Sequence, residues 1–259
     1  MRIEVAADTD VGRLRAVNQD AVHAATFRSR PDGPVDRACL IVADGLGGHA
    51  AGEIASALAI ETIADASASL LSRPDVSLDS PDSASAIADA VQEAHTRILA
   101  RATQEPRLAG MGTVIVVAWL VVREGEAGML LAHAGDSRAY HLADGALRQA
   151  TPDHSWVGEA VREGRLTADE ARTDPRRNVV TRSLGAQETV EVELNGPTRL
   201  SPGDRILLCS DGLHGVVDND ALRDLLGQGD PSATARALID AANAGGGPDN
   251  IGVAIAAIG

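Results

Sequence analysis

The chain has 259 residues, of which 44% are hydrophobic and only 2% aromatic, so its core must be built from Ala, Val, Leu and Ile. Its formal net charge is -14, from 23 basic and 37 acidic residues. Such a balance repels nucleic-acid phosphates and anionic membrane surfaces, and we expect neither as a partner. The length suits one large core, and no linker or internal repeat divides the chain. We therefore expect a single domain over residues 1–259.

The two cysteines, Cys39 and Cys209, both lie inside apolar runs. Two are too few for a disulfide framework. Gly45 and Gly215 stand six residues after them, where a cysteine-dependent phosphatase loop would need arginine. No apolar stretch approaches transmembrane length, and the first residues lack the basic and apolar segments of a signal peptide. We expect a cytoplasmic protein.

In the N-terminal part, hydrophobic periodicity predicts two strands followed by two helices. The predicted strands cover residues 3–8 and 39–43, and the predicted helices cover about 53–71 and 81–102. Ser80 followed by Pro81 supplies an N-cap and a first-turn proline for the second helix.

The middle of the chain is rich in β-branched residues, and near the end two helices lie between the last two strands. Strands are predicted over 113–122, 129–134, 139–142, 190–194, 205–210 and 251–258, and helices over about 219–228 and 231–244. The charged, glycine-interrupted segment 155–177 contains a capping-box pattern from Thr167 to Glu170. We expect this segment to be a mobile flap that influences substrate choice. Mid-chain strands joined by tight turns exclude a simple parallel series, so the pattern predicts an α+β layered sandwich.

Two apolar strands each end in Asp-Gly, at Asp44-Gly45 and at Asp211-Gly212. Such an end presents a carboxylate and an unshielded backbone carbonyl at one rim. Most Asp-Gly pairs only form turns, but a carboxylate that follows a buried strand is costly to desolvate without a partner. In the absence of a Cys/His cluster that would indicate zinc, this pattern favours Mg²⁺ or Mn²⁺. An all-oxygen pocket would be completed by three further aspartates, Asp20, Asp136 and Asp249.

Arg15 lies five residues before Asp20. A guanidinium beside a metal site is suited to clamping a phosphate through two hydrogen bonds; the alternative is a surface arginine paired with its acidic surroundings. The glycine-rich run 47–52 lacks the Gly-Lys-Ser/Thr ending of a P-loop and predicts a tight turn into the following helix.

Together these motifs resemble the metal-dependent protein phosphatase family, the type 2C serine/threonine phosphatases, in its short bacterial branch. The resemblance runs through nearly the whole chain. Each segment is weakly specific alone, and their common order makes the resemblance specific. The matching segments are 15–20, 42–49, 110–113, 134–140, 151–155, 181–185, 204–213 and 249–251.

The resemblance implies a four-layer α-β-β-α sandwich of two antiparallel sheets flanked by helices. It also implies two Mn²⁺ or Mg²⁺ ions, with Asp20 supporting them mostly through water and Asp136, with Asp211, forming a weaker third metal site. The implied ligands of the two-ion centre are Asp44, the carbonyl of Gly45, Asp211 and Asp249.

The implied reaction is attack of a metal-bridging water or hydroxide on a phosphoserine or phosphothreonine ester. Arg15 would bind the substrate phosphate and would form the catalytic set with Asp44 and Asp211. The implied partners are phosphorylated proteins, either a Ser/Thr kinase or its substrates in bacterial signalling, and we expect a monomer.

Two departures from the family pattern leave questions open. Gln19 stands where many members carry Glu, for which we expect an altered metal affinity. Leu46 stands where better-known members place a histidine after Asp-Gly. His49 would then either protonate the leaving group or play a structural role at the helix entrance.

Three alternatives remain. A serine hydrolase would use Ser137, although Ala139 replaces the last glycine of its elbow motif and its activity would survive EDTA. A non-catalytic phosphoprotein sensor would be expected to lose its metal aspartates. Within the family, the chain would be a specialised regulator that dephosphorylates one anti-sigma-factor-like partner.

Overall fold

The computed structural model describes residues 1–30, 32–47 and 51–259, whose strands form two five-stranded antiparallel sheets. The first sheet has the order β1 (Ile3–Asp10), β10 (Ile251–Ile258), β9 (Arg205–Cys209), β6 (Arg138–Ala143), β7 (Ala146–Gln149). The second has the order β2 (Asp20–Phe27), β3 (Arg37–Leu46), β4 (Gly112–Arg123), β5 (Glu126–Ala134), β8 (Glu193–Leu200).

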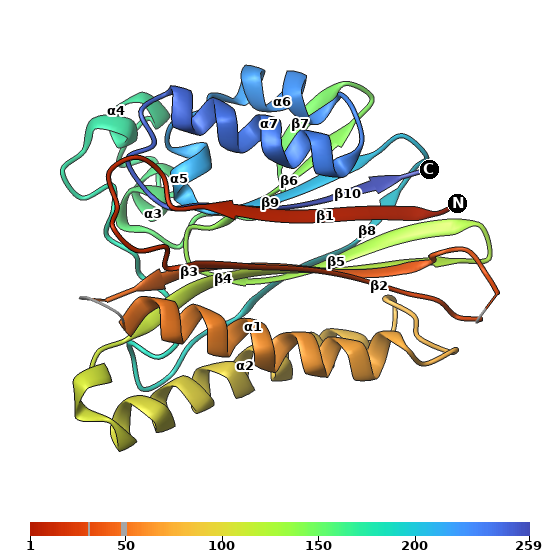
Figure 1. Ribbon diagram of the computed structural model, residues 1–259, viewed down its shortest axis with the longest axis horizontal. Coiled ribbons are helices and arrows are strands. Elements are labelled where there is room, and N and C mark those ends of the chain that lie inside the picture. Colours follow the sequence, from red (N-terminus) through yellow and green to blue (C-terminus); the bar gives the residue numbers. More distant parts are fainter. Residues whose placement is uncertain (31, 48–50) are drawn as a thin grey trace.

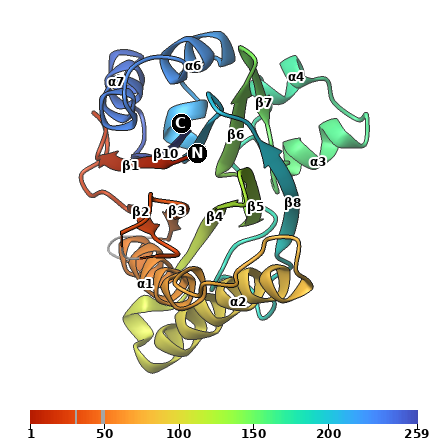
Figure 2. The ribbon, with the colours of Figure 1, turned by 90° about the vertical axis from the view of Figure 1, so that its right-hand side faces the viewer.

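Helices cover the outer face of each sheet (Figure 1). The second sheet is covered by α1 (Ala51–Leu71) and α2 (Pro81–Gln104), which is followed by a short 3₁₀ turn at Pro106–Leu108, and the first by α6 (Asn219–Leu226) and α7 (Pro231–Ala244). The short helix α5 (Asp211–His214) directly follows β9. The predicted four-layer α-β-β-α sandwich is thus confirmed. At its edge, α3 (Trp156–Arg162) and α4 (Ala168–Thr173) lie beside the β6–β7 hairpin (Figure 2).

The apolar residues form three layers of core, and the strands at the centre contribute to two of them. In β3, Cys39 and Ile41 face α1 and α2, whereas the alternating Leu40 and Val42 face the other sheet. Successive side chains of a strand point to opposite faces. A strand that is buried on both faces therefore reads as a continuous apolar run, which is why β3 and β4 are recognisable from sequence.

The capping signals are confirmed where the sequence placed them. The Ser80 hydroxyl accepts from the Asp82 backbone N–H at 3.2 Å and starts α2. Thr167 and Glu170 form a complete capping box at the start of α4, within the flap segment.

The strand predictions need correction at the sheet edges. Strand β2 was not predicted because it is an edge strand with half-exposed Ala, His and Thr side chains and weak alternation. The predicted strand at 190–194 is wrong in its limits, since β8 begins at Glu193 and continues to Leu200. Val190 and Val192 produce the apolar alternation there, but they pack against the helix-covered core before strand pairing begins.

The statement that no apolar stretch approaches transmembrane length also needs correction. Helix α1 has 21 residues and contains an 18-residue window with a mean hydropathy of 1.4, so by length and composition alone it is long and apolar enough to cross a membrane. A core helix of a soluble protein meets the same criteria, and Ala55, Ala59 and Ile63 of α1 are fully buried in the core beneath the second sheet. The helix is therefore weak evidence for a membrane.

Candidate metal centre

The structure brings the five predicted aspartates together at one end of the two sheets. Asp20 and Asp44 are cross-strand partners in β2 and β3. Asp211 begins α5 immediately after β9, and Asp249 lies just before β10. Asp136 lies in the turn between β5 and β6. Burial raises the pKa of Asp44 well above its usual value, and the charges of the other four carboxylates all raise it further, so the five form one electrostatic cluster.

The glycine that follows each central aspartate lets two backbone segments approach closely. A Cβ added at Gly212 would lie 1.9 Å from the carbonyl oxygen of Asn250, and one added at Gly45 would lie 2.4 Å from that of Gly52. Neither position can accept a side chain without moving its neighbour. Thr113 Oγ1 donates to the Asp44 carbonyl at 2.8 Å and fixes the end of β3 from β4.

The acidic cluster lacks enough positive charge to balance it. Burial, and then the charges of Asp211 and Asp249, raise the pKa of Asp20 to about 7, even though the Ser210 hydroxyl partly offsets this. Burial and the Asp211 charge raise the pKa of Asp136 to about 7, and burial and the Asp249 charge raise that of Asp211 to about 6. Carboxylates held this way favour bound cations, and an all-oxygen donor set fits Mg²⁺ or Mn²⁺.

Arg15 is a cation that contacts the cluster directly. Its Nη2 donates to Asp249 Oδ2 at 2.7 Å, and its side chain is 53% exposed. The loop that carries Arg15 is held by Asn250, whose Nδ2 donates to the carbonyls of Val11 at 2.9 Å and Val17 at 3.0 Å. Sequence reasoning missed this role of Asn250. The available signal was the position of Asn250, a polar amide residue between the predicted metal ligand Asp249 and the apolar strand that begins at Ile251.

Ser210 is a second residue whose role was missed. Its buried hydroxyl donates to Asp20 Oδ2 at 2.6 Å and accepts from the Gly252 backbone N–H at 2.8 Å. The bond orients a carboxylate of one sheet from a strand end of the other. A serine at the buried end of an apolar strand was the available signal.

A cavity of about 640 Å³ adjoins the cluster at Asp136 and Asp211, between the flap and the α5–α6 segment. Its lining includes Arg138, which makes two hydrogen bonds to Asp153, at 2.8 and 2.7 Å. His214 also lines it, and its Nε2 lies 3.1 Å from the Asp136 carbonyl oxygen. Burial lowers the pKa of His214 to about 3, so the ring is neutral and Nε2 carries the proton that it donates.

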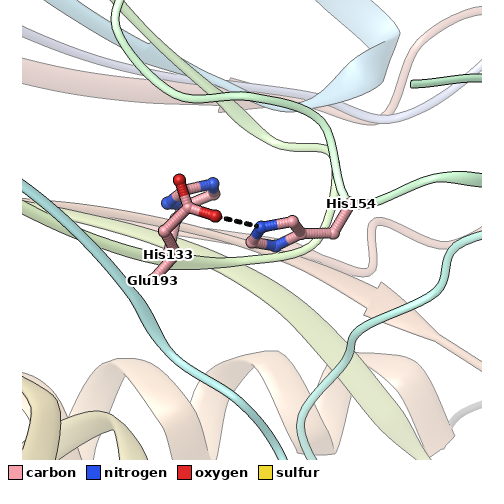
Figure 3. Close-up of side chains that lie close together, drawn as sticks. All are labelled: His133, His154 and Glu193. Atoms are coloured by element: carbon pink, nitrogen blue, oxygen red, sulfur yellow. Dashed lines mark hydrogen bonds and ion pairs between the residues drawn. The ribbon is translucent and has the colours of Figure 1, made fainter. Parts of the chain in front are cut away.

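Beside this region, His133, His154 and Glu193 form a second cluster of candidate metal ligands (Figure 3). The two rings are stacked 4.4 Å apart at an interplanar angle of 10°. Because ring lone pairs lie in the ring plane, two nearly parallel rings do not converge on one ion. The Gly135 N–H donates to His154 Nδ1 at 3.2 Å, so a neutral His154 carries its proton on Nε2 and donates it to Glu193 at 3.0 Å. This cluster is a hydrogen-bonded junction at the base of the flap.

The sequence also offers Ser137 as a candidate nucleophile and His49 as a candidate proton donor to the leaving group. Ser137 is buried, and within the described part of the chain its hydroxyl has no hydrogen-bond partner, so no histidine acts on it as a base. His49, and the tight turn expected around it, lie outside the described residues.

Comparison with known proteins gives a consistent result. Residues 13–238 match the family model described as protein phosphatase 2C. The chain is 35% identical to the serine/threonine phosphatase stp of Listeria welshimeri, over 95% of this chain and 92% of that protein. It is 37% identical to the serine/threonine protein phosphatase PstP of Mycobacterium tuberculosis, over 98% of this chain and 45% of that protein, so it spans less than half of that relative.

A solved structure extends the likeness to three dimensions. The catalytic domain of the serine/threonine protein phosphatase PstP, in complex with two manganese ions, superposes with a TM-score of 0.77. The two sequences are 34% identical, and the alignment covers 98% of this chain and 97% of that one.

Proposed function

Since this chain belongs to the protein phosphatase 2C family, a family of metal-dependent serine/threonine phosphatases, we propose that its acidic cluster is the catalytic centre that hydrolyses phosphoserine and phosphothreonine esters in proteins. The observation that carries the proposal is the convergence of Asp20, Asp44 and Asp211 from both sheets, with raised pKa values that call for bound cations.

In the proposed centre, Asp44, the Gly45 carbonyl, Asp211 and Asp249 would hold two divalent cations, and Asp20 would support them. Bound there, such ions would lower the pKa of a bound water and neutralise the phosphate charge. The chain itself supplies their arrangement: Ser210 orients Asp20, and Thr113 holds the backbone of Asp44. We assign a third, weaker ion to Asp136 and Asp211, which share one edge of the cluster.

Arg15 is the proposed phosphate ligand. Its one hydrogen bond to Asp249 fixes the guanidinium beside the cluster, and its half-exposed side chain keeps further N–H donors for phosphate oxygens. These donors would stabilise the charge on the transferring group, while His214 and Arg138 hold the adjoining cavity wall.

We also propose that residues 1–259 act as one catalytic domain, as a monomer in the cytoplasm, on phosphorylated proteins that include a Ser/Thr kinase or its substrates. The net charge of -14 opposes self-association. Cys39 and Cys209 are both buried free thiols, as is usual in a reducing compartment.

The proposal is tested by hydrolysis of para-nitrophenyl phosphate and a phosphothreonine peptide, with Mn²⁺ or with EDTA. We expect activity only with metal, and a loss of about a hundredfold or more in Asp44→Asn. The matched control is Asp240→Asn, an exposed carboxylate on α7. Activity that survives EDTA would instead favour metal-independent hydrolysis. Phosphopeptide binding without turnover would favour a non-catalytic sensor.

A further inference from the structure

The cavity beside the metal centre has an electrostatic asymmetry that the hydrolysis of a phosphate ester does not explain. Its lining includes Asp136 and Asp211 of the acidic cluster. The flap contributes Arg162, Arg172 and Arg177 to the same lining. None of the flap's acidic residues lines the cavity. In a chain with a net charge of -14, a wall of arginines without acids is unusual.

The three arginines are not neutralised by ion pairs among the described residues, unlike other arginines of this region. Arg165 pairs with Glu163 at 2.5 Å and Arg176 with Asp174 at 3.0 Å. Arg162, by contrast, donates to a backbone carbonyl, that of Asp153, at 2.7 Å. No carboxylate lies within ion-pair distance of Arg162, Arg172 or Arg177 in the described part of the chain.

Outside the aspartate cluster and the flap, three further charged side chains line the cavity. Arg138 and Asp153 form a two-bond pair. Asp218 is exposed and uses its carboxylate as the N-cap of α6, accepting from the Ala221 N–H at 2.9 Å. The three flap arginines outnumber this one carboxylate, so positive charge remains available to a ligand in the cavity that adjoins the metal centre.

We propose that this arginine wall (Arg162, Arg172 and Arg177) is a substrate subsite that selects phosphopeptides with a negatively charged side chain close to the phosphorylated residue. The inference rests on the proposed function, because it takes the scissile phosphate to lie at the aspartate cluster. A sphere of the cavity's volume would be about 11 Å across, and an extended peptide advances about 3.3 Å per residue. The selected side chain therefore lies within about three residues of the phosphorylated one.

The test compares phosphothreonine peptides that differ at a single flanking position, two residues from the phosphothreonine: Ala, Glu, phosphoserine or Lys. We expect wild-type kcat/KM to be about fivefold to tenfold higher for Glu than for Ala, higher again for phosphoserine, and lowest for Lys. The Glu-to-Ala ratio should shrink as salt is raised, because the arginines are exposed. The Glu and phosphoserine peptides separate a carboxylate from a second phosphate as the source of the negative charge.

The variant that decides the matter is Arg162→Gln/Arg172→Gln/Arg177→Gln, in which the Glu-to-Ala ratio should fall to about one. The control Arg236→Gln removes an exposed arginine of α7 and should keep the wild-type ratio. Equal kcat/KM for all four peptides, or a preference that persists in the triple variant, would overturn the subsite. Para-nitrophenyl phosphate separates the two claims: a wild type that hydrolyses it but shows no peptide preference refutes the subsite alone, whereas one that hydrolyses nothing refutes both.

Discussion

At the scale of single residues, the site depends on side chains that touch the aspartates as much as on the aspartates themselves. Asp44, Asp136 and Asp211 were predictable because each stands beside a glycine, whereas Asp20 and Asp249 were placed by their match to the family's motifs. The contacts of Ser210 and Asn250 were not, because each joins segments separated by about two hundred residues in the chain. The residue types marked both positions, but a single sequence does not show which distant residue each side chain contacts.

The role of Arg15 leads to the first prediction. In Arg15→Ala, kcat/KM for para-nitrophenyl phosphate should fall by about a hundredfold, because donors to the transferring phosphate are lost. Steady-state kinetics at saturating Mn²⁺ would measure this. The control is Arg148→Ala, an exposed arginine of β7. An unchanged kcat/KM would leave Arg15 as a surface partner of Asp249 only.

Ser210 provides the second prediction. Ser210→Ala leaves Asp20 Oδ2 and the Gly252 N–H without a partner in a buried place, so the free energy of unfolding should fall by about 1–3 kcal/mol. Urea denaturation would measure it. Ser232→Ala, at an exposed position of α7, should change little. Equal stability of the two variants would show that the Ser210 bonds are dispensable.

At the scale of elements, the sequence was informative where a strand is buried on both faces or a helix is capped. Strand β3 and helix α2 were recognisable for these reasons. Strand β2 and the limits of β8 were missed because both are edge strands. An edge strand pairs with only one neighbour and carries both polar and apolar side chains, so its sequence has no clear hydrophobic pattern. The candidate site could still be predicted because two of its aspartates, Asp44 and Asp211, lie at or just after the ends of the central strands β3 and β9.

The junction between α5 and the start of β10 can be tested through its glycine. Gly212→Ala would place a Cβ 1.9 Å from the Asn250 carbonyl oxygen and force apart the segments that carry Asp211 and Asp249. We expect a loss of stability of about 3 kcal/mol or more and weaker Mn²⁺ binding. Gly128→Ala in β5, whose added Cβ meets its nearest neighbours at 3.7 Å, is the control. Thermal unfolding of both, with and without Mn²⁺, measures the difference.

At the scale of the whole molecule, metal binding is linked to folding. The two sheets each bring carboxylates to the same end, so their repulsion opposes the packing of the sandwich unless protons or cations are present. The protein does not supply enough positive charge to balance these carboxylates. A bound cation should therefore stabilise the folded protein as well as activate it.

This linkage predicts a pH dependence in EDTA. The raised pKa values of Asp20 and Asp136 (about 7) and of Asp211 (about 6) mean that the native state binds more protons than the unfolded chain. Stability of the metal-free protein should therefore fall as pH rises. Buried histidines such as His214 have lowered pKa values and act in the opposite direction, but only below about pH 6.5. Between about pH 6.5 and 8.5, Tm in EDTA should drop by several degrees, and saturating Mn²⁺ should abolish the drop. A Tm in EDTA that is constant or rises over this range would contradict the linkage.

The central claim is that the aspartate cluster is a two-ion phosphatase centre, and a manganese titration of one metal-free sample tests it most directly. Bound Mn²⁺, followed by electron paramagnetic resonance, and hydrolysis of a phosphothreonine peptide would be measured at every point. We predict two ions per chain in the core site and activity that appears as the second binds, with both lost in Asp44→Asn. Full activity before any ion binds, or ion binding unaffected by Asp44→Asn, would contradict it.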